Sequence, residues 1–231
     1  MSDRFYYKIV QSRDRVDLVM SIFNKVYTYT TSHPDQFFLA LREHLLLVGG
    51  PLCIGLGLGL PLGLLSARSR LASLLVINSF NALRVIPSLA VLFVMIPYLG
   101  LSFQSAVVAL TFLAMPPILI STDVAFRSIS PATIEAASAM GMSQRQVLWQ
   151  IEIPLALPQI VAGIKTATVE VIASASLAAF IGAGGLGSFI VLGFSLYDQT
   201  ILLVGAIPIA VLALLAEISL SLAQRSLTPR R

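Results

Sequence analysis

The sequence predicts an all-α membrane protein with about five transmembrane helices, and three observations support this fold class. Apolar residues make up 57% of the 231-residue chain, whereas Asp, Glu, Lys and Arg together make up only 11%; a soluble domain carries about 25% charged residues. Several runs approach the roughly 20 apolar residues that a spanning helix needs. The charge is also uneven, because residues 1–43 hold 11 of the 26 charged side chains. These features exclude a soluble enzyme, a nucleic-acid-binding protein and a disordered tail.

The charged head, residues 1–43, is expected to form an extracytoplasmic amphipathic segment. Its apolar side chains recur at the three- and four-residue spacing of a helix face. They are Val16, Val19, Met20, Phe23, Val26 and Tyr27. Two arrangements fit this pattern equally: a helix that lies on the outer membrane surface, or a helix that packs against another subunit.

A transmembrane domain is expected over residues 44–223, and residues 45–65 form its first span. This run contains no charged side chain, and Gly55, Gly59 and Gly63 recur at every fourth position. In lipid, a stripe of small residues allows the backbone of a second helix to approach closely. The sequence therefore predicts a tight helix contact along this face.

The second span, residues 71–96, combines apolar residues with a polar stripe. Four polar side chains fall on one side of the helical wheel: Asn78, Asn81, Arg84 and Ser88. Pro87 interrupts the helix, because proline has no backbone N–H to donate.

Three further spans are expected over residues 105–122, 155–181 and 201–222. The third span contains adjacent prolines. The intervening stretch 123–152 is too polar to cross a membrane, so it is expected to be a loop between the third and fourth spans.

Basic residues predict the orientation of these spans. With five spans, the loops after the first and third spans share one side with the tail, residues 224–231. All the basic residues of the short connections lie on that side: Arg68, Arg70, Arg127, Arg145, Arg225, Arg230 and Arg231. Short loops rich in Lys and Arg face the cytoplasm. We therefore expect a cytoplasmic loop and tail, with the N-terminus outside.

The polar loop, about residues 128–152, carries the most informative motif. Pro131 suits the start of a short helix, and Gly141 suits its end. Ser143 to Trp149 can form a second short helix. Alanine-rich residues between Pro131 and Gly141 would leave a face that can lie flat in a partner's groove. These features alone predict an amphipathic helix–turn–helix between two spans.

The spacing within this loop resembles the signature of a known family. Glu135-Ala136-Ala137, three residues, Gly141, nine residues and then Ile151-Glu152-Ile153-Pro154 resemble the loop of the membrane subunits of binding-protein-dependent ABC importers. Ile153 stands where that family usually has Leu. The segments 84–90, 154–158 and 181–187 resemble the permeases for glycine betaine, choline, carnitine and related osmoprotectants.

This resemblance implies the type I ABC importer permease fold, in a bacterial inner membrane, with a loop that docks into a cytoplasmic ATPase. The residues that match the coupling signature are Glu135, Ala136, Ala137, Gly141, Ile151 and Pro154. The implied partners are two ATPase subunits, a second permease copy or homologue, and an extracytoplasmic substrate-binding protein. ATP and Mg²⁺ would belong to the ATPase, and this chain would hold no cofactor or metal. An amino acid such as methionine is the alternative substrate.

Charged residues inside the expected spans form a second candidate site. Arg84 and Glu170 would each cost about 2.5–3.5 kcal/mol at the bilayer centre on insertion scales, so each is expected to face a cavity or a partner. Thr166, Glu170 and Ser174 recur at four-residue steps and form a second polar stripe. We expect the two stripes to face each other or to line a pathway, with Arg84 and Glu170 as a candidate pair; the alternative is a structural bridge between helices with no role in transport. Lys165 could instead reach the membrane surface.

Catalysis in this chain finds little support. The sequence contains no G-x4-G-K-[ST] phosphate-binding loop, and no catalytic residue is proposed. Gly182, Gly184 and Gly187 satisfy G-x-G-x-x-G, but no strand precedes them, so a close-packed helix end is the better interpretation. A membrane-embedded hydrolase is the distant alternative.

Overall fold

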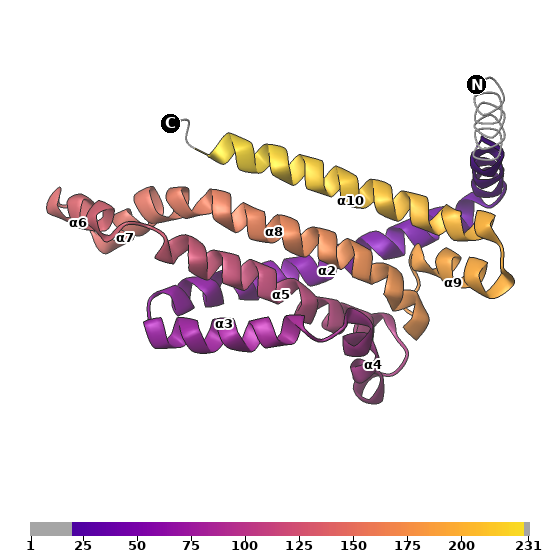
Figure 1. The fold of residues 1–231 in the computed structure, drawn as a ribbon, viewed down its shortest axis with the longest axis horizontal. Coiled ribbons are helices and arrows are strands. Elements are labelled where there is room, and N and C mark those ends of the chain that lie inside the picture. Colours follow the sequence, from indigo (N-terminus) through magenta and orange to yellow (C-terminus); the bar gives the residue numbers. More distant parts are fainter. Residues whose placement is uncertain (1–19, 229–231) are drawn as a thin grey trace, which may run out of the picture.

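The computed structural model describes residues 20–228, and nearly all of them are helical (Figure 1). The elements in chain order are α2 (Pro34–Ala67), α3 (Arg70–Arg84), α4 (Ser88–Leu99), α5 (Phe103–Arg127), α6 (Pro131–Ala139), α7 (Gln144–Val147), a π-helical turn (Leu148–Glu152), α8 (Ile153–Ala175), a 3-10 turn (Ser176–Ile181), α9 (Gly187–Leu196) and α10 (Gln199–Leu227). Four stretches are long and apolar enough to cross a membrane, and the bent pair of α3 and α4 makes a fifth. The predicted fold class is therefore confirmed.

The long helices run side by side and give the molecule two distinct ends (Figure 1). The short helices α6 and α7 lie at one end, together with the C-terminal end of α10; we call this the loop end. Helix α9 and the N-terminal helical residues lie at the opposite end. The packing order is α2 on α5, α5 on α8, and α8 on α10, so α5 occupies the centre of the bundle.

The glycine stripe of the first span lies against α5, as its spacing predicts. A Cβ atom built on Gly55 would lie 3.1 Å from the Ala114 Cβ, and one on Gly59 would lie 3.0 Å from the Ile118 side chain. At Gly63 the fit is tightest, with 2.6 Å to the Thr122 Cβ. These distances leave no room for a side chain, so the two backbones approach as closely as small residues permit.

The second span is broken at Pro87, where the sequence predicts an interruption. Helices α3 and α4 meet at an angle of 94° across residues 85–87. Pro87 cannot continue the hydrogen-bond ladder, and the residue before a proline is driven out of the helical conformation. The side chain of Ser69 accepts a hydrogen bond from the Ala72 N–H and caps the start of α3. The span therefore begins alongside α2 and α5 and then turns sharply.

The fourth span starts earlier than expected, although it ends at Ile181 as expected. Helix α7, the π-helical turn, α8 and the 3-10 turn form one uninterrupted helical stretch, Gln144–Ile181, so the second short helix of the loop is continuous with the span. Beyond it, α9 was not expected from the sequence. Gly187 and Gly205 allow α9 to pack tightly, because a Cβ at Gly187 would collide with the Ser176 carbonyl oxygen and one at Gly205 would lie 2.5 Å from the Leu186 carbonyl oxygen. The glycine-rich segment is thus a close-packed helix end, as predicted.

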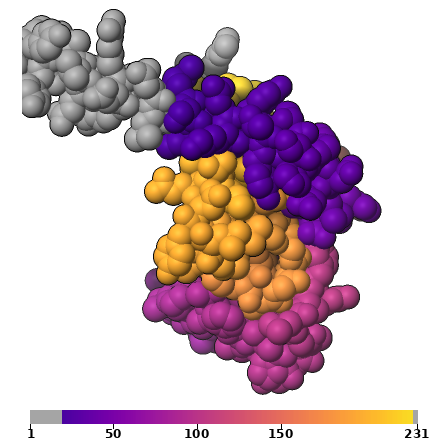
Figure 2. All heavy atoms as spheres, turned by 90° about the vertical axis from the view of Figure 1, so that its right-hand side faces the viewer, coloured from indigo at the N-terminus to yellow at the C-terminus, as the bar shows by residue number. Residues whose placement is uncertain are grey.

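The described part of the amphipathic head, residues 20–32, is helical. Val16 and Val19 lie outside the described residues. Phe23 and Tyr27 are exposed, whereas the Tyr29 ring makes an edge contact with Phe189 of α9 at 6.4 Å between centroids. Figure 2 looks onto this end, where the indigo N-terminal residues lie against the orange segment that contains α9. Helix α2 itself begins at Pro34, before the expected start of the first span.

The glycine contact yields a paired stability prediction. We expect Gly63→Ala to destabilise the protein by about 1–3 kcal/mol, because the added methyl group overpacks the contact with α5. Gly57 is the matched control on the same helix, since nothing lies within 4 Å of a Cβ built there, and Gly57→Ala should be neutral or slightly stabilising. Thermal unfolding of the detergent-purified variants measures the difference. Equal melting temperatures for the two variants would contradict the close approach.

Candidate functional site

The signature loop forms a short helix with defined ends. Pro131 occupies the first turn of α6, where its missing N–H costs nothing. At the other end Gly141 adopts a positive φ of 85°, and the N–H groups of Gly141 and Met142 donate to the carbonyls of Ser138 and Ala137. This pattern is a Schellman motif, for which glycine is the preferred residue. Pro131 and Gly141 thus begin and end α6 as the sequence predicts.

The residues of the coupling signature face in different directions. Glu135 and Ala136 are exposed, whereas Ala137 is buried and helps to hold α6 against the rest of the loop. Met140 and Trp149 are exposed large apolar side chains, at 75% and 62%. The loop end therefore presents small, acidic and apolar groups together, and exposed apolar side chains beside polar ones are typical of a protein contact surface.

The two remaining signature residues lie where the loop joins α8. Ile151 is half-buried in the π-helical turn, and Pro154 is exposed in the first turn of α8. Because Pro154 has no N–H, it cannot donate to the residue four positions before it. The Ile153 N–H instead donates to the Leu148 carbonyl, which widens the turn. The proline of the signature thus accounts for the π-helical turn that joins the loop to α8.

A bidentate ion pair, which the sequence did not indicate, anchors this junction. Arg68, at the end of α2, donates from Nη1 and Nη2 to the two carboxylate oxygens of Glu152, at 3.0 and 2.5 Å. The Glu152 side chain is only 5% exposed and that of Arg68 is 50% exposed. The hydrogen bonds favour the charged guanidinium, so Glu152 raises the pKa of Arg68. The loop is therefore tied to the α2–α3 turn.

A buried carboxylate links three helices next to this pair. Asp123 is fully buried within α5 and not in a loop, which corrects the expected boundary of the third span. Its two carboxylate oxygens accept hydrogen bonds from Ser66 of α2 at 2.6 Å and Ser73 of α3 at 2.9 Å. The only signal in the sequence was an acidic residue at the end of an apolar run, and nothing in it identified the two serines.

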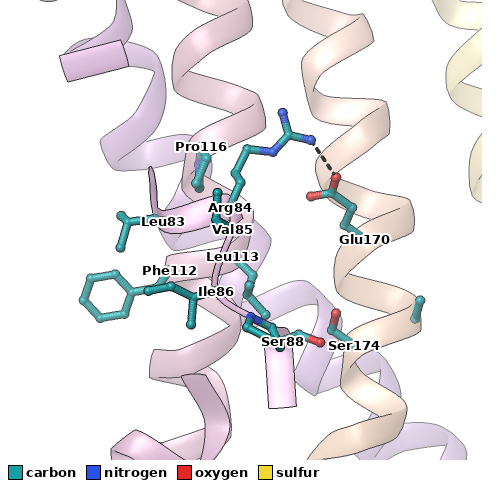
Figure 3. A pocket seen from close by; sticks show the side chains of 12 residues that line it. Leu83, Arg84, Val85, Ile86, Ser88, Phe112, Leu113, Pro116, Glu170 and Ser174 are labelled. Atoms are coloured by element: carbon teal, nitrogen blue, oxygen red, sulfur yellow. Dashed lines mark hydrogen bonds and ion pairs between the residues drawn. The ribbon is translucent and has the colours of Figure 1, made fainter. Parts of the chain in front are cut away.

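The second candidate site is a cavity at the break between α3 and α4. It has a volume of about 380 Å³ and lies between this break, α5 and α8. Arg84 Nη2 donates to Glu170 Oε1 at 3.1 Å, and Figure 3 shows this pair above Ser88 and Ser174. Four of the seven predicted polar residues thus converge here, two from each stripe.

The other three residues of the stripes do not line this cavity. Asn78 and Asn81 are exposed on α3. Thr166 is also exposed, and its hydroxyl donates to the Ala162 carbonyl of its own helix. Asn78 and Asn81 lie earlier on α3 than Arg84, so a helical wheel groups side chains that share a direction but lie at different heights along the helix.

A further ion pair within the spans was not expected. Lys165 Nζ lies 3.0 Å from Glu217 Oε1 of α10 and donates to Ser221 at 3.2 Å. Lys165 therefore binds a neighbouring helix and does not extend alone to the surface. In the described part of the chain, no group of three His, Cys, Asp or Glu side chains could hold a metal ion.

The end opposite the loop contains one more polar contact. Glu43 of α2 accepts a hydrogen bond from the Gly185 N–H at 2.8 Å. The neighbouring Gly184 has a positive φ of 80°, and a Cβ there would collide with the Glu43 carboxylate. Sequence patterns placed Glu43 in the charged head, so they did not associate it with the glycine-rich turn.

Comparisons with known proteins agree with this arrangement. Residues 59–231 match the family described as the binding-protein-dependent transport system inner membrane component. The chain is 37% identical to the carnitine transport permease protein OpuCB of Listeria monocytogenes over 89% of this chain and 94% of that protein. It is 34% identical to the glycine betaine/carnitine/choline transport system permease protein OpuCB of Bacillus subtilis over 90% and 95%.

A solved structure of similar fold is the MetNI methionine ABC transporter in an inward-facing conformation. The TM-score is 0.71 at 25% identity, over 84% of this chain and 97% of the compared chain. The protein therefore belongs to the family of binding-protein-dependent transport system inner membrane components.

Proposed function

We propose that this chain is the permease subunit of an ABC importer for quaternary ammonium osmoprotectants such as glycine betaine, carnitine or choline. The observation that carries this proposal is the 34–37% identity, over about nine-tenths of the chain, to permeases named for these compounds. Methionine is the weaker alternative, since the methionine transporter shares the fold at 25% identity.

The loop end would face the cytoplasm and contact the ATPase. Arg68, Arg70, Arg127, Arg145 and Arg225 all lie at this end, and basic short loops favour the cytoplasmic side. Exposed Glu135, Met140 and Trp149 would form the contact surface. ATP and Mg²⁺ would be held by two partner ATPase subunits, and a second permease copy or homologue and an extracytoplasmic binding protein would complete the importer.

The Arg68–Glu152 pair supports a mechanical role for this surface. A loop that moves with the ATPase can shift the transmembrane helices only if it is attached to them, and a transport cycle needs contacts that differ between its states. Bidentate guanidinium–carboxylate pairs hold orientation as well as distance. Movement of α6 would thus reach α2 and α3 through Arg68, and α8 directly.

The substrate class is tested by ATPase stimulation in liposomes. The complete importer is reconstituted, and its binding protein is loaded in turn with glycine betaine, choline, carnitine and methionine. We expect at least one quaternary ammonium compound to stimulate hydrolysis and to be taken up. Stimulation by methionine alone would favour the alternative and contradict the osmoprotectant assignment.

The docking surface is tested by reversing the charge of Glu135. We expect Glu135→Arg to reduce co-purification of the ATPase subunit about tenfold, because loss of a favourable interfacial charge contact is worth at least about 1.4 kcal/mol. Ser226→Arg, on exposed α10 at the same end, adds positive charge away from α6 and serves as the control. Equal ATPase recovery with both variants would remove Glu135 from the interface.

The loop anchor is tested by a double-mutant cycle. We expect Arg68→Gln to lower stability by about 1–3 kcal/mol, less than the 3–5 kcal/mol typical of breaking a fully buried pair, because the Arg68 side chain is half exposed. The double variant Arg68→Gln/Glu152→Gln should recover part of that loss, since it no longer buries an unpaired carboxylate. The melting temperatures of the wild type, the two single variants and the double variant give the coupling energy between Arg68 and Glu152. If the effects of the two single substitutions simply add in the double variant, the direct interaction is ruled out.

A further inference from the structure

The cavity at the α3–α4 break combines two opposite charges with an apolar wall. Arg84 and Glu170 face each other across it, Pro116 and Leu113 of α5 lie near Arg84, and the Phe112 ring points away from the pair (Figure 3). Its volume of about 380 Å³ is in the range of small-molecule sites, which combine mostly apolar walls with a few fixed polar groups. A ligand here would meet a cation and an anion together, with apolar side chains beside them.

The Arg84–Glu170 pair is open, in contrast to the Arg68–Glu152 pair. Only one guanidinium nitrogen and one carboxylate oxygen are joined, at 3.1 Å, and the two side chains are 44% and 41% exposed. A guanidinium has five N–H donors and a carboxylate has two acceptor oxygens. Both groups therefore retain binding capacity for a ligand, whereas Glu152 uses both oxygens on Arg68 and is buried.

The arrangement matches the charges of a zwitterion. A ligand carboxylate can accept two parallel hydrogen bonds from the Arg84 guanidinium. A quaternary ammonium group has no N–H to donate, so it would be held by the Glu170 charge and by contact of its methyl groups with apolar residues.

Net charge distinguishes zwitterions from cations in this cavity. Arg84, Glu170 and a zwitterion sum to zero, so each charge keeps a partner when the ligand separates the pair. Choline would occupy Glu170 and leave the Arg84 guanidinium unpaired between apolar helices, where uncompensated charge is expensive.

We infer that this cavity is a transient substrate site that prefers zwitterionic quaternary ammonium compounds over cationic ones. Arg84 binds the carboxylate and Glu170 binds the ammonium group. This inference rests on the proposed function and narrows it, because it assigns part of the selectivity to the permease itself.

The test compares uptake of glycine betaine and choline by the reconstituted importer, with one binding protein that accepts both. Arg84→Gln should lower betaine uptake about tenfold or more, as expected for loss of a hydrogen bond to a charged group, and should lower choline uptake much less. Glu170→Gln should lower choline uptake more than betaine uptake. The two variants thus shift the choline-to-betaine ratio in opposite directions.

Two further variants separate binding from structure. The charge swap Arg84→Glu/Glu170→Arg keeps one charge of each sign and should restore betaine uptake above either single variant. Lys165→Gln removes a different interhelical ion pair, with Glu217 on α10, and should leave the ratio unchanged. Co-purification with the ATPase confirms that each variant assembles.

The outcomes are distinct. A ratio that stays at the wild-type value in both single variants, or that Lys165→Gln shifts equally, would overturn the cavity assignment. If wild-type choline uptake is below detection, the charge-swap variant provides the test. If its betaine uptake is no higher than that of the single variants, the inference is overturned. Wild-type protein that transports none of glycine betaine, choline and carnitine would instead contradict the proposed function.

Discussion

The close approach of α5 to its two neighbours is the contact on which the rest of the structure depends. Lipid provides little hydrophobic force between helices, so association relies on van der Waals contact and polar bridges. Gly55, Gly59 and Gly63 bring α2 against one side of α5. On the other side Gly163 of α8 meets α5, where a Cβ would collide with Ser121 and lie 2.7 Å from the Pro117 carbonyl oxygen. The positions of α2 and α8 then determine where the polar groups can meet.

Those polar groups differ in how far they are buried and in how many hydrogen bonds they accept. At the loop end, Asp123 and Glu152 are buried and accept two hydrogen bonds each, which makes them fixed joints between helices. In the cavity, Arg84 and Glu170 share one hydrogen bond and remain open. A membrane protein that changes conformation needs both kinds of contact, since rigid joints transmit motion and open pairs can exchange partners.

Much of the architecture follows from local patterns in the sequence. Apolar runs in the sequence predicted α2, α5, α8 and α10. Pro131 and Gly141 predicted the two ends of α6. The ends of the spans could be predicted less well from the sequence. Helix α9 is only ten residues long and follows a glycine-rich turn, so hydropathy gave it no separate signal. Its position depends on close contacts with the 3-10 turn and α10, which are tertiary.

The sequence by itself determined the long apolar spans, the loop that carries the family signature, and Arg84 and Glu170 as charges within the spans that could pair. Only the tertiary structure decided that this pair forms and that Arg68 binds Glu152. Arg68 and Glu152 are separated by 84 positions, and Arg84 and Glu170 by 86, and no periodicity connects residues so far apart. Their pairing depends on the interhelical distances around α5 and on the 94° bend at Pro87. The cavity lies at the C-terminal end of α3, so Arg84 and Ser88 line it, whereas Asn78 and Asn81 lie earlier on α3 and do not, because a helical wheel gives the direction of a side chain and not its position along the axis.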